Sequence, residues 1–380
     1  MPDVPDTTGR IILYTSGTTG PSKGVIHTQR SMQTLACYNV ETLRYCEDDR
    51  LLNFFPLFHQ NARYTGVMPA LYAGASIRLE RKLSTSCFWQ TCDADGITAF
   101  NYLGSVLRLI LNATPPERVA GTHSIRKAFG AGAPADVWEA FETRLGIRLV
   151  ETYGSSEAPM ATLNVRGGDR ETEIGSAGHA SDLFDVAIVD GDDRPLAPGE
   201  VGEIVLRPRR ADVLTLGYHN KDAATVAAWR NLWFHTGDRG RLSAHGCLFF
   251  EDREKDCIRR RGENISAWEV ESVLIRHPDI AEVAVYGLPN DDVDEEVAAA
   301  IVLKRKDAEL SDIVAFGARH LPKWAVPTLL RVMRELPRTP TEKVQKRALR
   351  DAGRAVHVAA ADIAAGMAHR NADKQKRGTL

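Results

Sequence analysis

Residues 14–24 of this 380-residue chain read YTSGTTGPSKG. An apolar run, residues 11–14, leads into them and predicts a buried strand. Glycines let backbone N–H groups approach an anion closely, hydroxyl side chains add further donors, and Lys23 supplies a positive charge. The order of strand, hydroxyl- and glycine-rich loop and lysine therefore predicts a loop that binds a triphosphate.

Two alternatives explain this loop less well. The P-loop of kinases and GTPases needs Gly-Lys followed by Ser or Thr, whereas here Ser22 precedes Lys23 and Gly24 follows it. A surface turn rich in Gly and Thr shares the composition but does not account for the strand before it and the lysine after it. The phosphate-binding interpretation is therefore favoured.

The overall composition is that of an ordinary globular enzyme. Apolar residues make up 43% of the chain and charged residues 26%, and its length predicts two or three domains. The 48 Lys and Arg residues nearly balance the 50 Asp and Glu residues, so no overall field attracts nucleic acid. We expect no membrane span and no signal peptide. The six cysteines show no metal-type spacing, which predicts free thiols and a cytoplasmic protein.

Short apolar runs alternate with helix-length segments from residue 11 to about residue 155. This alternation predicts parallel βαβ units in a sheet covered by helices, with ligands at the carboxyl ends of the strands. The predicted strands are residues 11–14, 51–55, 76–79, 97–102, 126–129 and 148–153, and the predicted helices lie at about 28–45, 62–73, 84–94, 104–112 and 134–145.

Two different patterns follow. Short strands at 185–189, 201–207 and 247–251, separated by turn sequences, predict a small antiparallel sheet or distorted barrel. Beyond residue 253, a capping box at Ser266–Glu269 opens a predicted helix to about residue 276. Strands at 280–286, 297–303 and 329–333 and a helix at 310–320 complete a compact α+β unit.

Four further segments place polar groups at the ends of predicted strands or in turns. His59 follows the second strand, and residues 129–134 offer small side chains where a planar ring can approach the backbone. Residues 150–157 supply an aromatic ring, hydroxyls and a carboxylate suited to Mg²⁺. Residues 234–238 place Asp238 on a tight turn, where it suits a ribose diol. Taken singly, each segment could be a turn or a surface charge, and a lone histidine is more often structural than catalytic.

Together and in this order, these segments resemble the adenylate-forming enzymes, a superfamily that includes acyl-CoA synthetases, firefly luciferase and nonribosomal-peptide adenylation domains. Five motifs match between residues 11 and 268, and a sixth, partial match ends at Lys343. Residues 77–88 and 150–157 are similar to those of acyl-CoA ligases, including crotonobetaine/carnitine-CoA ligases.

The resemblance implies a role for each matching residue. His59 would lie at the mouth of the acyl pocket, Glu157 would bind Mg²⁺, and Ser156 would face the α-phosphate. The β- and γ-phosphates would be bound by Thr15, Ser16, Gly17, Thr18, Thr19, Gly20 and Lys23, the adenine by Gly132, Ala133, Pro134, Tyr153 and Gly154, and the ribose by Asp238 and Arg253.

Three matching residues lie further along the chain. Lys255 matches the hinge about which the C-terminal domain rotates between half-reactions, and Gly262 matches the glycine beside the pantetheine tunnel. The basic run before Gly262 is by itself better explained as a solvated face. Lys343 matches the lysine that bridges the carboxylate and the α-phosphate. Glu342 replaces the glycine that usually precedes this lysine, which reduces loop flexibility and places an anion beside the catalytic cation.

The implied fold is α/β: a large domain with a parallel sheet covered by helices and a small distorted β-barrel, followed by a small mobile α+β domain. Residues 1–252 would form the AMP-binding domain, with 175–252 as its barrel-like part. Residues 253–352 would form the C-terminal lid and residues 353–380 a helical or disordered tail.

The implied activity is ATP-dependent carboxylate–CoA ligation, with ATP, Mg²⁺ and CoA as cofactors and a small carboxylic acid as substrate. Two alternatives stay open: transfer of the acyl group to a carrier-protein thiol, and a nucleotide-binding remnant without catalysis. The family's large domain begins more than a hundred residues before its phosphate loop, so an N-terminal subdomain is expected to be missing here. An exposed apolar surface is then expected. Three explanations stay open: a fragment, the product of a truncated or mis-started gene, or a shortened protein that forms a homo-oligomer or has a partner that supplies this subdomain.

Overall fold

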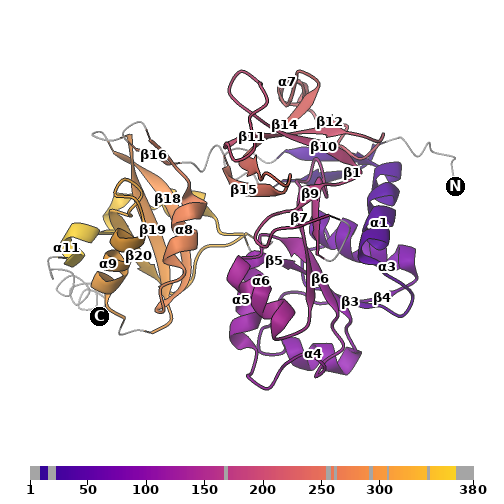
Figure 1. The fold of residues 1–380 in the computed structure, drawn as a ribbon, viewed down its shortest axis with the longest axis horizontal. Helices are drawn as coiled ribbons and strands as arrows, with labels where there is room; N and C mark the ends of the chain where they lie inside the picture. Colours follow the sequence, from indigo (N-terminus) through magenta and orange to yellow (C-terminus); the bar gives the residue numbers. More distant parts are fainter. Residues whose placement is uncertain are drawn as a thin grey trace. The chain divides into compact units, whose positions relative to one another are not determined.

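The computed structural model describes residues 9–15, 23–166, 170–253, 258–260, 263–290, 294–305, 308–339 and 343–364. The chain divides into two compact units, Met1–Phe250 and Glu251–Leu380, and each is described by itself (Figure 1). Among the described helices, none combines the length and the apolar character that crossing a membrane requires.

A seven-stranded sheet forms the centre of the first unit, in the order β4-β3-β5-β6-β7-β8-β9. The strands from β4 to β7 run parallel, whereas β8 and β9 pair antiparallel at the end of the sheet. This confirms the predicted α/β fold with a parallel sheet. The strands are β3 (Arg50–Asn53), β4 (Ser76–Leu79), β5 (Ala99–Leu103), β6 (Lys127–Ala131), β7 (Arg148–Tyr153), β8 (Thr162–Val165) and β9 (His179–Ala180).

Helices cover both faces of this sheet. Successive side chains of a strand point to opposite faces, so the apolar side chains of one strand contribute to two cores. On β5, Phe100 and Tyr102 belong to the core that includes side chains of α4, α5 and α6, whereas Ala99 belongs to the core with α1 and α3. The segment predicted as one helix at 62–73 consists of α2, η1 and α3, of which η1 is a π-helix. The helices are α1 (Gln29–Leu43), α2 (Gln60–Ala62), η1 (Arg63–Val67), α3 (Met68–Ala73), α4 (Phe88–Asp95), α5 (Gly104–Ala113) and α6 (Ala135–Thr143).

The strand predicted at residues 11–14 forms, but the prediction that it belongs to the parallel sheet is wrong. β1 (Gly9–Tyr14) pairs antiparallel with β2 (Gly24–Thr28), and β2 pairs antiparallel with β12 (Gly217–Tyr218). The loop reverses the chain within a few residues, and the Thr15 N–H donates to the Lys23 carbonyl over 2.9 Å. A short reversal of this kind joins antiparallel strands, whereas parallel strands need a long crossover.

A five-stranded sheet follows, in the order β10-β11-β14-β13, with β15 also paired to β14. It corresponds to the predicted small antiparallel or barrel-like part. The prediction that Asp238 lies on a tight turn is wrong, because residues 234–238 lie within β14. Gly237 has a φ of +69° there, and the register with β11 is irregular nearby, so the strand bulges and continues. The elements are β10 (Phe184–Val189), β11 (Gly202–Pro208), α7 (Asp222–Ala227), β13 (Trp229–Arg230), β14 (Trp233–Leu242) and β15 (Leu248–Arg253).

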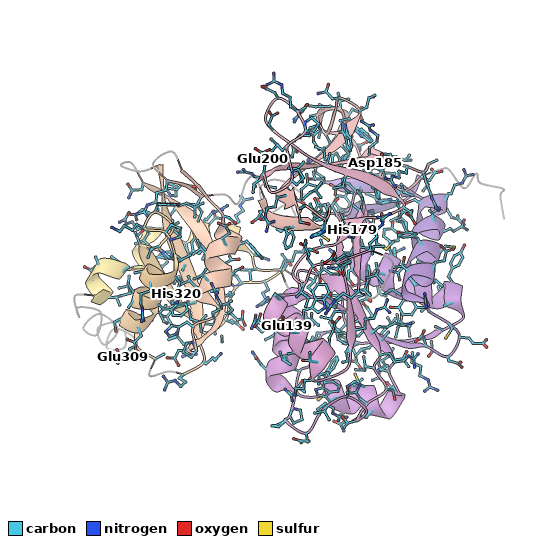
Figure 2. The ribbon with its side chains drawn as sticks, in the orientation of Figure 1. Glu139, His179, Asp185, Glu200, Glu309 and His320 are labelled. Carbon is cyan, nitrogen blue, oxygen red and sulfur yellow. The ribbon has the colours of Figure 1, made fainter. Side chains whose placement is uncertain are left out.

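The seven-stranded and five-stranded sheets are joined by backbone hydrogen bonds. Ala177 N–H donates to the Leu248 carbonyl, and Leu248 N–H donates to the Gly178 carbonyl, over 2.7 and 2.8 Å. His179 of β9, labelled in Figure 2, lies 3.5 Å from the buried Cys247 sulfur. These contacts fix the end of the central sheet against the β14–β15 pair.

The second unit contains a six-stranded sheet in which β18 and β19 pair antiparallel over most of their length and β19 and β20 pair parallel. The predicted cap of its first helix forms, since the Ser266 hydroxyl accepts from the Glu269 N–H over 3.2 Å. Within the segment predicted as a tail, β21 pairs with β20 and Ile363 is buried in the core. The elements are β16 (Ile258–Arg260), β17 (Glu263–Ile265), α8 (Ala267–Leu274), β18 (Ile280–Asn290), β19 (Asp294–Leu303), α9 (Leu310–His320), β20 (Leu329–Met333), α10 (Lys346–Asp351), η2 (Arg354–Val356), β21 (Val358–Ala359) and α11 (Ala360–Ala364).

Candidate functional site

The two ends of the predicted phosphate loop lie side by side. Besides the backbone bond between them, the Thr15 hydroxyl lies 3.4 Å from both the backbone nitrogen and the carbonyl oxygen of Lys23. The loop therefore leaves and returns at one point, at the ends of β1 and β2. The predicted phosphate ligands between them, Ser16, Gly17, Thr18, Thr19 and Gly20, lie outside the described residues.

The lysine of this loop and the predicted Mg²⁺ ligand contact the same tyrosine. The Tyr218 hydroxyl donates to Glu157 Oε1 over 2.8 Å, and Lys23 Nζ lies 4.4 Å from the centre of the Tyr218 ring. Burial, followed by the nearby Glu157 charge, raises the pKa of Tyr218, so it stays a hydroxyl donor. Tyr218 is not among the residues predicted from the sequence, because a tyrosine ending a two-residue strand has no distinctive pattern.

The loop after β7, which carries the predicted phosphate and metal residues, is held from two sides. The Ser155 hydroxyl accepts from the N–H groups of Glu157 and Ala158, and the Ser156 carbonyl lies 2.6 Å from His27 Nε2. His27 is fully buried, and burial lowers its pKa, so the neutral ring donates from Nε2. At Gly154, a side chain would meet the Met160 nitrogen at 2.7 Å, so this position requires glycine.

Tyr153 and Asp238, predicted to contact the adenine and the ribose, are brought together. The Tyr153 hydroxyl donates to Asp238 Oδ2 over 2.9 Å, and both side chains are 7% exposed. The Tyr153 ring stacks on Phe250, with ring centres 6.2 Å apart and an interplanar angle of 27°. Arg253, the other predicted ribose residue, ends β15, and its side chain lies outside the described part.

The predicted adenine-contacting residues follow β6 and are held by a buried carboxylate. Gly132, with a φ of +79°, and Ala133 donate their N–H groups to Glu151, which also accepts from the Tyr102 hydroxyl over 2.6 Å. Burial raises the pKa of Glu151 to about 7, and the three hydrogen bonds oppose that shift. Pro134 then caps α6. Glu151 is not among the residues predicted from the sequence, where its only signal is a carboxylate inside an apolar strand.

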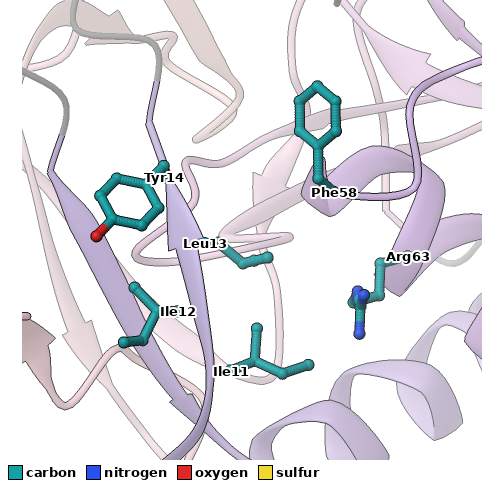
Figure 3. A pocket seen from close by; sticks show the side chains of 6 residues that line it. All are labelled: Ile11, Ile12, Leu13, Tyr14, Phe58 and Arg63. Carbon is teal, nitrogen blue, oxygen red and sulfur yellow. The ribbon is translucent and has the colours of Figure 1, made fainter.

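His59 caps α2, and its Nδ1 accepts from the Asn61 N–H over 3.2 Å. The preceding residue, Phe58, lines a hollow of about 450 Å³ together with Arg63 and residues 11–14 of β1. Figure 3 shows Phe58 and Arg63 on one side of this hollow and β1 on the other. Tyr14 and Phe58 are 63% and 59% exposed, so apolar side chains of the hollow face solvent.

Lys343 belongs to the second unit, where its side chain is exposed. Its N–H donates to the Thr339 hydroxyl over 3.2 Å, and the Thr339 N–H donates to its carbonyl over 2.8 Å, so it lies on a closed turn. Glu342 lies outside the described residues, as do the predicted hinge Lys255 and the predicted tunnel residue Gly262.

The oxygen donors of the first unit fit Mg²⁺ that is bound together with a nucleotide. Mg²⁺ is usually held by one or two carboxylates and by substrate phosphates rather than by a protein cage. Glu157 supplies one carboxylate, and the described residues contain no group of three or more His, Cys, Asp or Glu side chains that could hold a metal ion. Glu157 is thus a residue that would hold the ion against the phosphates.

The chain matches two family models: the AMP-binding enzyme family over residues 3–219, and the AMP-binding enzyme C-terminal domain over residues 269–343. It is 33% identical over 354 residues to a sulfoacetate–CoA ligase of Cupriavidus necator, with 91% of this chain and 67% of that protein covered. It is 32% identical over 352 residues to a crotonobetaine/carnitine–CoA ligase of Salmonella arizonae, with 92% and 68% covered.

Solved structures agree with these relatives. ATP-bound MatB from Rhodopseudomonas palustris superposes with a TM-score of 0.83 at 26% identity, covering 92% of this chain and 69% of that one. The o-succinylbenzoate CoA synthetase MenE from Bacillus subtilis, in complex with its acyl-adenylate intermediate, gives a TM-score of 0.80 at 28% identity, covering 92% and 70%. The chain belongs to the family of AMP-binding enzymes.

Proposed function

We propose that this chain is an ATP-dependent carboxylate–CoA ligase. It would activate a carboxylic acid as an acyl-adenylate with release of pyrophosphate, then transfer the acyl group to CoA with release of AMP. The observation that carries the proposal is the grouping of Lys23, Tyr218 and Glu157 beside the end of β7, in a chain whose relatives are CoA ligases.

The chemistry requires positioning and charge neutralisation more than proton transfer. A carboxylate is a poor acyl donor because oxide is a poor leaving group. Its oxygen attacks the α-phosphorus of ATP, the bond to the β-phosphate bridging oxygen breaks, and pyrophosphate leaves. Lys23 would bind the β- and γ-phosphates, and Lys343 would bridge the carboxylate and the α-phosphate. Glu157 would hold Mg²⁺, which would supply positive charge against the phosphates.

The nucleoside would be held by the residues around β6, β7 and β14. Gly132, Ala133 and Pro134 would border the adenine, with Tyr153 stacked nearby and Asp238 on the ribose diol. Tyr153 and Asp238 are hydrogen-bonded to each other. A single bound nucleoside could therefore contact Tyr153 with its adenine and Asp238 with its ribose. His59 would lie at the acyl pocket.

The second half-reaction would use the second unit. Rotation about Lys255 would withdraw Lys343 and admit CoA beside Gly262, and the CoA thiol would then attack the acyl carbon and release AMP. We also propose a cytoplasmic location, supported by the free thiols of Cys37, Cys46, Cys87, Cys92 and Cys247.

The proposal is tested by measuring pyrophosphate release from the purified chain with Mg-ATP and a panel of acids, with and without CoA. The panel takes sulfoacetate, crotonobetaine, carnitine and o-succinylbenzoate from the names of the relatives, and adds short- and long-chain fatty acids. Acid-dependent release with equal CoA consumption supports the ligase. Release without CoA consumption points to a carrier-protein thiol as acceptor, and no release from a folded chain that binds ATP points to a non-catalytic nucleotide-binding protein.

A further inference from the structure

Tyr218 lies between two oppositely charged groups and contacts both through different parts of its side chain. Its hydroxyl donates to Glu157, and its ring carries the Lys23 ammonium 4.4 Å from the ring centre. Within the part of the chain that the structure describes, Lys23 and Glu157 form no direct ion pair. The tyrosine therefore separates a cation and an anion that would otherwise be free to neutralise each other.

The backbone around Tyr218 fixes this side chain in place. Tyr218 pairs with Val25 of β2, and its N–H donates to the Thr225 hydroxyl over 2.9 Å. The ring is 7% exposed. At the preceding residue, Gly217, the φ is +134° and a side chain would meet Thr225 Cγ2 at 2.7 Å, so the strand end is tightly packed. A side chain held in this way has little freedom to follow its two partners.

We propose that Tyr218 is a positioning residue for Mg-ATP: its hydroxyl orients the Glu157 carboxylate toward the metal ion, and its ring keeps Lys23 available to the phosphates. This inference rests on the proposed function. A hydrogen bond to a carboxylate fixes its direction while leaving it able to bind a cation. An ammonium over an aromatic face is attracted weakly enough to be given up when a phosphate binds.

The two parts of the side chain can be tested separately. Tyr218→Phe removes the hydroxyl and keeps the ring, so we expect about tenfold weaker binding of Mg-ATP, with little change for ATP in EDTA. Tyr218→Leu removes both, so that Lys23 can pair with Glu157, and we expect weaker ATP binding with and without Mg²⁺. Adding Glu157→Gln to Tyr218→Leu should then restore part of the binding in EDTA, because Lys23 is released.

A matched control exists in the same unit. Lys127 Nζ lies 4.4 Å from the centre of the Tyr45 ring, the same distance as between Lys23 and Tyr218, and Tyr45 is 6% exposed. Lys127 forms its ion pair with Asp49 instead of lying beside Glu157. Tyr45→Phe should leave ATP binding within about twofold of wild type in both conditions.

The experiment is isothermal titration of ATP into each full-length variant, with Mg²⁺ or with EDTA, after thermal unfolding has shown that each is folded. Weakening by Tyr218→Phe only in Mg²⁺, together with restoration by Glu157→Gln in the Leu background, supports the inference. If Tyr218→Phe weakens binding equally in Mg²⁺ and in EDTA, or by no more than Tyr45→Phe does, the inference is overturned; so it is if Glu157→Gln restores no binding in the Leu background. Pyrophosphate release by wild type reports separately on the proposed function, and a wild type that binds no nucleotide would overturn both.

Discussion

The Tyr153 hydroxyl donates to Asp238 Oδ2 over 2.9 Å, which joins the end of β7 in the seven-stranded sheet to the bulge of β14 in the five-stranded sheet. The backbone bonds between Ala177, Gly178 and Leu248 hold the same two sheets together. A nucleoside bound by both residues would therefore lie against a fixed junction of two sheets, and a change at either residue should disturb the other.

We expect Asp238→Ala to weaken AMP binding more than tenfold, because it removes the predicted ribose ligand and the carboxylate that accepts the hydrogen bond of the Tyr153 hydroxyl. Tyr153→Phe keeps the ring and should cost about threefold. The double variant should be weakened by less than the product of the two effects, because the residues share one interaction. Titration of AMP into the four proteins measures this. Strict additivity would show that the hydrogen bond does not couple the two contacts.

The raised pKa of Glu151 predicts that the stability of the protein depends on pH. Burial raises the pKa of this carboxyl to about 7, above the unfolded value of about 4.5. A group whose pKa is raised by folding stabilises the protein fully below its unfolded pKa and loses that contribution as pH rises through its folded pKa. Relative to Glu151→Gln, the free energy of unfolding of wild type should therefore fall between about pH 4.5 and pH 7, by about 3 kcal/mol at most.

The measurement is urea unfolding of wild type and Glu151→Gln at several pH values, and the difference between the two curves removes the contribution of other titrating groups. Glutamine can accept from the Gly132 and Ala133 N–H groups and donate to the Tyr102 oxygen, so it keeps the contacts. A difference that is flat from pH 4.5 to pH 8 would contradict the raised pKa.

The parts of the fold that the sequence predicted well are those with strong local patterns. The strands of the parallel sheet and the helices between them follow from hydrophobic periodicity, and the Ser266 cap follows from its spacing to Glu269. The partner of a strand is a non-local property. Residues 11–14 were therefore assigned to the wrong sheet, and Asp238 to a turn, although Gly237 allows β14 to bulge and continue.

In the candidate site too, residues in local sequence motifs were predicted, and residues that act through non-local contacts were not. Lys23, Tyr153 and Glu157 lie in motifs with a recognisable order, whereas Tyr218, His27 and Glu151 act through contacts with residues far away in the sequence. A histidine that contacts a carbonyl 129 residues away leaves no local pattern. Such supporting residues become visible only when the tertiary contacts are known.

The close approach of Gly104 to Gly132 predicts a steric effect of substitution on the turn that we propose borders the adenine. A side chain at Gly104 would lie 1.7 Å from the Gly132 carbonyl oxygen, so the backbone of the turn would have to move. We expect Gly104→Ala to destabilise the protein by about 3 kcal/mol and to weaken AMP binding. Gly191→Ala is the matched control, because no atom lies within 4 Å of a side chain there, and it should change stability by less than about 1 kcal/mol. Equal unfolding midpoints for the two variants would refute the predicted clash.

The role proposed for Lys343 predicts that a substitution can block adenylation without blocking the transfer of the acyl group to CoA. Lys343 belongs to the second unit and is exposed on the turn closed by Thr339. Lys343→Ala should reduce acid-dependent pyrophosphate release by about a thousandfold, since it removes the charge that we propose bridges the carboxylate and the α-phosphate. The same variant should still convert a supplied acyl-adenylate and CoA into thioester at a rate near that of wild type. Lys23→Ala should instead raise the KM for ATP, because the role that we propose for Lys23 is to bind the outer phosphates. If Lys343→Ala released pyrophosphate normally, the bridging role would belong to another cation.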